Sequence, residues 1–383
     1  QVTERASASR SDTVSDVSGT EKAVDDAAAG FLNVDQLGDL AAMASAIPGV
    51  QLLLGADGAG DAFSVFGLGG DQNNTQLNGL NFGDAALPRD ASVMTSLATS
   101  SYDVSRGGFS GGQLQVRTRS GSNFIRRSLS GNLITPQMQW LDQTGLATGQ
   151  QFTNMSLGGS ASGPIKADRA FFNTSFQYDR RLQDLQTLLS ESSLGFETAG
   201  VAADSVARLL SILSSSNVPI TVGGYSPQRI NNRATVLNSF DYVQANSNRG
   251  NTYAITLSGN YSGTAPVGGG GGGFGGFGGG AANLFTPTRD GTRDNFGGAL
   301  QARHSGLLGF QGIFTESTIG YSMSRNNSDP FAILPAGTVR VNSQLVDGSS
   351  AVSSLLFGGS PSLNTAWRST ILCRGFPTIT ATA

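Results

Sequence analysis

The side chains that most often carry out chemistry are scarce in this sequence. His304 is its one histidine and Cys373 its one cysteine, so no histidine-based metal cluster, cysteine-ligated zinc site or intramolecular disulfide can be assembled from them. The 27 aspartates and glutamates leave a glycosidase-type carboxylate pair open, but no nucleophile, base and orienting group converge in the sequence. We therefore expect no catalytic residue, no metal and no cofactor, and a protein that is not an enzyme.

A glycine-rich run at residues 268–280 is the other segment that could bind a ligand, since glycine-rich loops can hold phosphates. The run is interrupted by Phe274 and Phe277, and it lacks the Gly-Lys-Ser/Thr ending of a phosphate-binding loop. We interpret it as a flexible surface linker inside a long loop.

The composition narrows the class of protein further. Charged residues make up 13% of the 383, against roughly 25% in an ordinary soluble domain, and hydrophobic residues make up 38%. A net charge of −3 does not indicate the basic patch that nucleic-acid binding usually needs, so we expect no nucleic-acid partner. No apolar run reaches the roughly 18 residues of a transmembrane helix, which excludes a helical membrane protein and leaves a β-barrel open.

The first 125 residues divide into two parts. Residues 1–30 are rich in Ser, Thr, Asp and Ala and have few apolar side chains, so we expect a disordered tail. Residues 31–125 mix two spacings, which predicts a small α+β domain. Helical spacing occurs at 37–43 and again at 93–97, whereas 114–118 alternates as a strand.

From residue 126 to 366 the apolar residues largely recur with a period of two. In the run 252–261, for example, Tyr253, Ile255 and Leu257 face one way, and Thr256 and Ser258 face the other. Similar runs lie at 171–178 and 313–323. Each is close to the 9–11 residues that a tilted strand needs to cross a bilayer. The fold class predicted is mainly β: a small α+β domain followed by an incomplete antiparallel transmembrane β-barrel.

The connections between these runs alternate in length. We expect short turns at 166–169, 246–250 and 305–309, and long loops at 183–228, 265–295 and from 326 onward. Short turns at one end and long loops at the other are typical of an outer-membrane barrel. Within the first long loop, residues 202–213 place Val206, Leu209, Leu210 and Leu213 on one helical face. A short helix packed on its own loop is one interpretation, and a ligand-contacting helix is the other.

Several segments, in the right order, resemble the plug domain of TonB-dependent outer-membrane receptors. They are residues 47–50 (IPGV), 64–75 (SVFGLGGDQNNT), 77–80 (LNGL), 102–116 (YDVSRGGFSGGQLQV) and 118–124 (TRSGSNF). The segments are most similar to the Oar-like group, whose N-terminus carries a carboxypeptidase-regulatory-like β-sandwich. Residues 329–331 (DPF) and 334–339 (LPAGTV) also resemble loop segments of that group.

The resemblance implies a mechanism and a location. A receptor of this kind lies in the outer membrane of a Gram-negative-type bacterium, and its partners are the TonB complex of the inner membrane, outer-membrane lipid and an extracellular substrate. The substrate binds at the outer loops and the plug apices. TonB captures a short segment before the plug as an added β-strand and then remodels the plug. The group implies a large substrate, and no residue here identifies it.

The resemblance also suggests site residues. Candidates for ligand binding or for contacts between plug and barrel lumen are Asp71, Asn73, Asn74, Asn78, Arg106 and Arg119. For most of these residues we favour the interpretation that they shape the plug, whereas the two arginines are better candidates for charged contacts with a polar lumen. The best match to a TonB box in the tail is residues 12–17, with Asp12, Thr13, Val14 and Val17, and an ordinary disordered tail is the alternative.

The sequence departs from the family at both ends. The β-sandwich and a signal peptide are not seen, and about seven or eight strands are recognised where such transporters close about 22. Alternation fades over residues 367–383, which predicts an aberrant or truncated end. Because lipid does not tolerate an open sheet edge, we expect that the chain alone does not transport. The alternative to a receptor fragment is a non-transporting surface or secreted β-rich binding or adhesion module.

Overall fold

The computed structural model describes residues 21–23, 40–53, 62–81, 87–98, 110–147, 150–244, 250–267, 284–308, 313–360 and 366–378. Several predicted features lie outside these residues. They are Arg106, the glycine-rich run, most of the turn at 246–250 and the TonB box candidate with Asp12, Thr13, Val14 and Val17.

The small N-terminal domain, called the plug domain below, contains a five-stranded sheet with the order β1-β6-β7-β4-β5. Its elements are β1 (Glu21–Ala23), α3 (Leu40–Ser45), β2 (Val50–Leu53), β3 (Ala62–Val65), the 3-10 helix η1 (Gly70–Gln72), β4 (Asn74–Leu77), β5 (Leu80–Asn81), β6 (Val93–Ala98) and β7 (Gln113–Thr118). Residues 21–23 fall inside the segment predicted as a disordered tail, yet they pair with β6. The α3 helix and the β7 strand confirm the sequence predictions at 37–43 and 114–118.

The predicted helix at 93–97 is wrong, because this segment is strand β6. The apolar positions 93, 94 and 97 fit a helical face, but burial follows a period of two in which Thr95 and Leu97 are buried and Met94 is exposed. The strand lies between β1 and β7 and pairs with both of them. This long-range pairing decides the conformation of a segment too short for its periodicity to do so.

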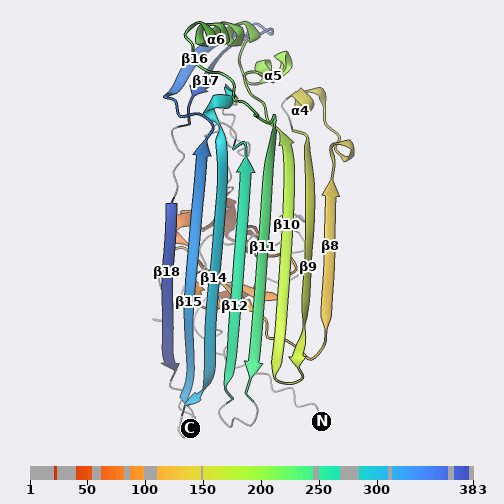
Figure 1. Cartoon of the computed structure of the whole chain (residues 1–383), viewed down its shortest axis with the longest axis vertical. Helices are drawn as coiled ribbons and strands as arrows, with labels where there is room; N and C mark the ends of the chain where they lie inside the picture. Colours follow the sequence, from red (N-terminus) through yellow and green to blue (C-terminus); the bar gives the residue numbers. More distant parts are fainter. Residues whose placement is uncertain are drawn as a thin grey trace.

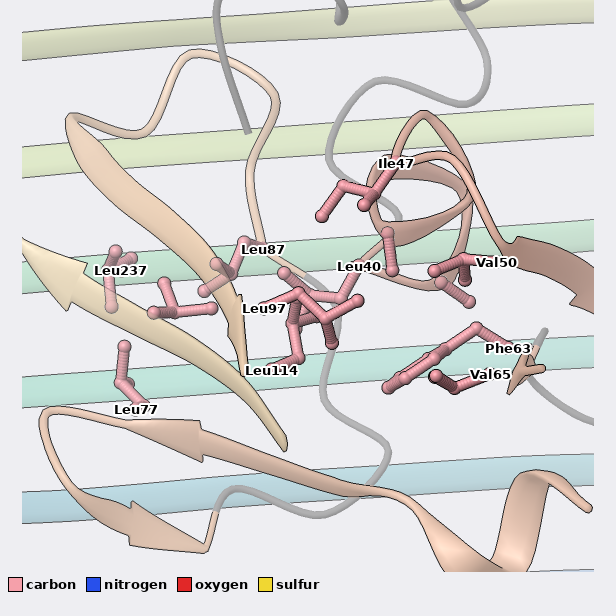
Figure 2. Close-up of a cluster of buried hydrophobic side chains, with 13 residues drawn as sticks. Leu40, Ile47, Val50, Phe63, Val65, Leu77, Leu87, Leu97, Leu114 and Leu237 are labelled. Atoms are coloured by element: carbon pink, nitrogen blue, oxygen red, sulfur yellow. The ribbon is translucent and has the colours of Figure 1, made fainter. Parts of the chain in front are cut away.

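The plug core lies between α3, the β2–β3 hairpin and the five-stranded sheet (Figure 2). Leu77, Leu114, Val65 and Val116 have no exposed surface. Leu237 belongs to this cluster although it lies more than a hundred residues further along the chain, in a strand of the large sheet. The plug core is therefore completed by the sheet that the plug packs against.

The large sheet, called the wall below, is an antiparallel meander of eight strands (Figure 1). The strands are β8 (Arg126–Ile134), β9 (Phe152–Lys166), β10 (Ala170–Asp184), β11 (Gln228–Val243), β12 (Thr252–Ala265), β14 (Gly291–Leu308), β15 (Ile313–Pro330) and β18 (Ala366–Thr378). The wall begins at the residue where the sequence predicts a change of period. Most of its strands exceed the 9–11 residues that a bilayer requires.

The observed connections confirm two predictions and correct three. The turn at 166–169 and the loop at 183–228 are confirmed, since β9 ends at Lys166 and β11 begins at Gln228. The turn predicted at 305–309 is displaced, because β14 continues to Leu308 and Gly306 pairs with Thr315. The loops predicted at 265–295 and from 326 are too long, since β14 begins at 291 and β15 ends at 330. Ser305 is paired with both β12 and β15, and Gly306 is paired with β15, so these residues continue the strand.

The last strand forms where side-chain alternation fades, and the aberrant or truncated end stays a prediction. Residues from 367 onward, where alternation fades and the sequence predicts an aberrant end, continue as β18 through Thr378 and pair with β15. Pairing uses backbone N–H and C=O groups, so a strand can form without regular side-chain alternation.

Segments from three long loops assemble a cap at one end of the wall (Figure 1). It contains α5 (Ser193–Thr198), α6 (Ala203–Ser215), β13 (Leu284–Phe285), the 3-10 helix η3 (Pro287–Arg289), β16 (Ala336–Gln344) and β17 (Ser350–Gly358). The nearby β8–β9 loop carries the 3-10 helix η2 (Pro136–Met138) and α4 (Gln143–Ala147).

The predicted helix at 202–213 is confirmed as α6. Its buried residues Val206, Leu209 and Leu213 share a core with Phe196 of the same loop and Leu355 of β17. The helix thus packs on its own loop and on a second one. In the described part of the chain, no helix combines the length and the apolar character that crossing a membrane requires.

Candidate functional site

The two faces of the wall differ sharply in chemistry. The inner face, which the plug covers, buries polar side chains: Asn154, Ser156, Asn173, Ser175, Thr235, Ser239, Thr256, Ser258, Gln301 and Thr318. The outer face presents large apolar side chains that are 39–60% exposed: Met155, Leu157, Phe176, Phe240, Tyr242, Tyr253, Ile255, Leu257, Tyr261, Phe296, Leu300, Ile319 and Tyr321. This confirms the alternation predicted at 252–261. The arrangement reverses that of a soluble sheet, where the apolar face is the covered one.

Aromatic side chains bound the apolar outer face at two heights. Tyr242, Tyr253 and His304 lie side by side near the short-turn end, with ring centroids 6.4 Å and 4.8 Å apart. Tyr261 pairs with Phe296 nearer the cap. Eight residues of β12 separate Tyr253 from Tyr261, which is about 27 Å along a strand. Membrane barrels present an apolar band about 25 Å tall between aromatic girdles, and about 27 Å of a strand tilted by about 40° spans roughly 20 Å of that height, so the spacing is similar to that of a membrane barrel.

The β4–β5 hairpin connects the plug to the wall through Asn78. Asn78 and Gly79 form its two-residue turn, with φ of 49° and 86°, which matches the type I′ turn that an Asn-Gly pair favours. The Asn78 Oδ1 accepts from the Thr118 N–H at 3.0 Å, and its Nδ2 donates to Thr256 Oγ1 of β12 at 3.2 Å. One side chain therefore joins two plug strands to the wall.

Two more contacts surround this hairpin. The Nε2 of Gln301 in β14 donates to the Leu77 carbonyl at 3.2 Å. The Leu80 side chain lies against Gly320 of β15, where an added Cβ would collide with it. Residues 77–80, the LNGL segment that resembles a receptor plug, thus contact three adjacent wall strands.

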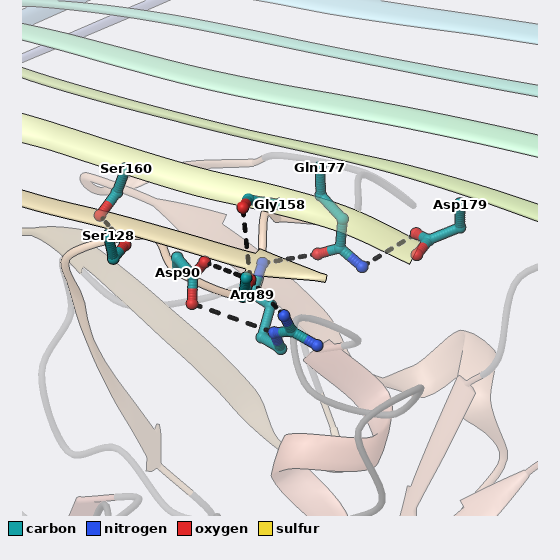
Figure 3. Close-up of polar contacts among 8 residues, drawn as sticks. Arg89, Asp90, Ser128, Gly158, Ser160, Gln177 and Asp179 are labelled. Carbon is teal, nitrogen blue, oxygen red and sulfur yellow. Dashed lines mark hydrogen bonds and ion pairs between the residues drawn. The ribbon is translucent and has the colours of Figure 1, made fainter. Parts of the chain in front are cut away.

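A second group of contacts centres on Arg89 and Asp90 (Figure 3). The Arg89 N–H donates to Gln177 Oε1 of β10 at 2.7 Å, and its guanidinium donates to the hydroxyl of Ser130 in β8. That hydroxyl donates in turn to Asp90 Oδ2 at 2.8 Å, and Asp90 lies 3.9 Å from the Arg89 Nε. The plug is therefore held to the wall at two separated places.

Sequence reasoning missed Arg89 and Asp90. Between residues 31 and 125 they are the one place where opposite charges adjoin in the sequence. In a domain with so few charges, that pair was the available signal. The residues that Arg89 contacts, Ser130 and Gln177, have no such signal in the sequence, because serine and glutamine are common throughout the strands.

The structure brings only part of the predicted site together. Asn73 shapes the plug, because its Oδ1 accepts from the Gly112 N–H at 2.8 Å and its Nδ2 donates to the Phe63 carbonyl. Asn74 joins β7 through its backbone, Asp71 is exposed on η1, and Arg119 is exposed with its N–H donating to Ser92. Within the described residues, Asn78 is the one predicted candidate with a side-chain hydrogen bond to the wall. Ligand contact by these residues stays a prediction.

The contact between plug and wall is polar and incompletely paired. Among the described inner-face atoms, Thr235 Oγ1, Ser239 Oγ and Gln301 Oε1 are buried without a hydrogen-bond partner in the protein. Water can satisfy such groups when the plug moves, whereas it would oppose the separation of two apolar surfaces. The interface therefore resists separation less than an apolar one of the same size.

A shallow pocket lies where the cap meets the wall. Its volume is about 180 Å³, and its lining includes Thr187, Leu189 and Tyr225. The Tyr225 hydroxyl donates to Asp290 Oδ2 at 3.2 Å, and burial together with this carboxylate raises the pKa of Tyr225. In the described part of the chain, no cluster of three or more metal-ligating side chains occurs.

We predict that Asn78→Gly loosens the hairpin while leaving its turn intact. Glycine retains the positive φ but removes the bonds to Thr118 and Thr256, a loss of about 1–2 kcal/mol. Hydrogen exchange of residues 74–81 should accelerate by about tenfold. Gln72→Ala, on an exposed side chain of the same domain, is the control and should leave these rates unchanged. Equal rates in wild type and Asn78→Gly would contradict this role.

No protein-family model matches the sequence, and no curated protein does. Several solved structures, in contrast, match most of the chain. The outer membrane transporter YddB from Escherichia coli aligns with a TM-score of 0.53 and 12% identity, over 88% of this chain and 43% of the transporter. The siderophore receptor PirA from Acinetobacter baumannii gives 0.54 and 10%, over 93% and 44%. A mutant of the ferric enterobactin receptor PfeA from Pseudomonas aeruginosa gives 0.51 and 10%, over 94% and 46%.

The fold is that of a plug domain and part of a receptor barrel. This confirms the predicted fold class: mainly β, with a small α+β domain followed by an incomplete antiparallel sheet. The chain spans less than half the length of the three structures. All three are described as a transporter or receptors and none as an enzyme.

Proposed function

We propose that this chain is part of a TonB-dependent outer-membrane receptor that takes up a large extracellular substrate. One observation carries the proposal: the wall turns an aromatic-bounded apolar face outward and a polar face toward the plug. A soluble binding or adhesion module would have to leave that apolar face in water, which is unfavourable over such an area. The similarity to outer-membrane receptors supports the same location.

The plug is the proposed gate. Its described contacts with the wall are hydrogen bonds around Asn78 and Arg89, together with apolar packing of Leu237 in the plug core and of Leu80 against Gly320. TonB would capture the tail as an added strand and pull the plug away from the inner face. The strand β1 pairs with β6 through only three residues and is the described strand nearest to the tail. It would therefore be the first strand to detach when the tail is pulled.

The proposed substrate is large, and the Oar-like resemblance of residues 47–124 supports this class. The cap supports it too, since three loops build a folded layer with its own apolar core rather than a narrow pocket. PirA and PfeA are described as siderophore and ferric enterobactin receptors. Those substrates belong to PirA and PfeA, and the proposal for this chain stays with the large class that the resemblance implies.

Capture by TonB can be tested at the predicted box. We expect Val14→Pro to reduce cross-linking of the full-length protein to TonB by about tenfold, because proline removes a backbone donor and disfavours an added strand. Ala8→Pro, in the same tail but outside residues 12–17, is the control. Equal cross-linking of all three proteins would contradict the assignment of the box. Absence of TonB cross-linking in the wild type, with the protein in the soluble fraction, would instead support the adhesion-module alternative.

A further inference from the structure

The segment between the plug and the first wall strand is fastened to the wall separately from the plug body. It comprises Gly121, Ser122 and Asn123, called the anchor below, and it lies between β7 and β8. None of the contacts around Asn78 or Arg89 involves it. Its partners are instead gathered near the short-turn ends of β9, β10 and β11.

Asn123 makes a two-point contact with the β9–β10 turn. Its Nδ2 donates to Asp168 Oδ1 at 2.6 Å, and its Oδ1 accepts from the Asp168 N–H at 3.0 Å. Asp168 has a φ of 62°, so the tight turn presents its N–H and its carboxylate in the same direction. A hydrogen bond to a charged acceptor is among the stronger ones a side chain can make.

Gly121 makes the second contact. Its N–H donates to Asp241 Oδ2 of β11 at 3.1 Å, and the ring of Phe171 in β10 occupies the space where a Cβ would lie. Glycine is therefore required for the backbone to approach this closely. Phe171 and Asp241 are directly opposite each other on β10 and β11, so both contacts of Gly121 lie at the same place on the wall. The short-turn ends of β9, β10 and β11 are called the corner of the wall below.

That corner is itself firmly connected. The Val243 N–H donates to the Arg169 carbonyl at 2.7 Å, which ties the β9–β10 turn to the end of β11. Only three residues after Asn123, Arg126 begins the pairing of β8 with β9 opposite Ser162. Any tension that passes the anchor would act directly on that pairing.

We propose that residues 121–123 are a mechanical stop, which holds the end of the plug to the wall while the plug body is pulled away. This inference rests on the proposed function, since it requires a pull on the N-terminal tail. The plug contacts at Asn78 and Arg89 release first. The anchor then carries the tension into the paired corner of β9, β10 and β11, and β8 stays in the sheet.

Single-molecule pulling of the full-length protein in outer-membrane vesicles tests the stop. With the handle attached at residue 1 of this sequence, release of the plug should end at a plateau about 420 Å long, from about 120 residues at about 3.5 Å each. At constant force, Asn123→Ala should shorten the lifetime of this plateau by about tenfold. Asp168→Gly keeps the positive φ and the backbone N–H that Asn123 Oδ1 accepts from, so it should shorten the lifetime less than Asn123→Ala, and the double variant should match Asn123→Ala. Ser122→Ala should match wild type, because the Ser122 hydroxyl donates to the nearby Phe124 carbonyl and not to β9, β10 or β11.

Two results would overturn the proposal in distinguishable ways. A plateau of unchanged lifetime in both Asn123→Ala and Asp168→Gly would show that the anchor carries no load, with the receptor assignment intact. If plug and wall of the wild type unfold in one event, with no plateau near 420 Å, the result would contradict the mechanical stop. It would also contradict the proposed function, which requires a plug that separates from the wall.

Discussion

Leu257→Arg is expected to lower the yield of folded protein in the outer membrane severely. Leu257 lies on the outer face of β12, halfway between Tyr253 and Tyr261, and is 45% exposed in the isolated chain. In the proposed receptor that position lies at the middle of the bilayer, where an arginine on the lipid face of a barrel costs about 2–4 kcal/mol. The folded fraction should be measured by heat-modifiable migration and by guanidinium titration in vesicles.

Tyr253→Arg is the matched control for this experiment. It lies on the same strand and the same face but in the aromatic row near the short turns, where the same substitution costs about 0–1 kcal/mol. The depth of the substitution, rather than the added charge, should therefore decide the loss. Equal effects of the two substitutions, or a harmless Leu257→Arg, would contradict a lipid environment for this face.

Leu114→Ala should have the largest effect within the plug. Leu114 has no exposed surface and lies on β7, which pairs with β6 on one side and β4 on the other. Removing its side chain leaves a cavity at the centre of the core, and substitutions of this kind cost about 2–5 kcal/mol. A small domain has little stability to lose, so we expect the plug to unfold or to exchange its amide hydrogens throughout.

Met94→Ala controls for the change of side-chain volume. Met94 is 53% exposed on β6, so its loss should change plug stability by no more than about 0.5 kcal/mol. Hydrogen exchange also tests whether the plug is a separate unit, because amides of β9 to β14 should remain protected in Leu114→Ala. Loss of protection in plug and wall together would contradict the division into a movable plug and a fixed wall.

The strands of the wall were predictable because the alternation of apolar and polar residues occurs in most of them. In β12 most outer-face residues are apolar and most inner-face residues are polar, so Ile255 and Thr256 are assigned to faces by composition, with Ala254 and Gly259 as exceptions. Leu237 shows the limit of this signal. It is apolar on the polar inner face, since it completes the plug core, and nothing near it in the sequence identifies that role.

The remaining errors come from contacts between distant residues. The β6 strand has apolar positions that fit a helix, and only its pairing with β1 and β7 makes it extended. The turn near residue 305 was misplaced because Gly306 is held in register by Thr315. The Arg89 contacts with β8 and β10 depend on how the plug sits against the wall, which no short segment encodes.

Spin labels scanned through residues 252–261 of the full-length protein in bilayers test the central claim most directly, with Cys373 replaced by serine. Lipid-soluble oxygen and a water-soluble nickel chelate would report the environment of each label. We predict a period of two, in which labels at Ile255 and Leu257 collide with oxygen and those at Thr256 and Ser258 are shielded from it. Greater contact of the Ile255 and Leu257 labels with the nickel chelate would place that face in water and contradict the account.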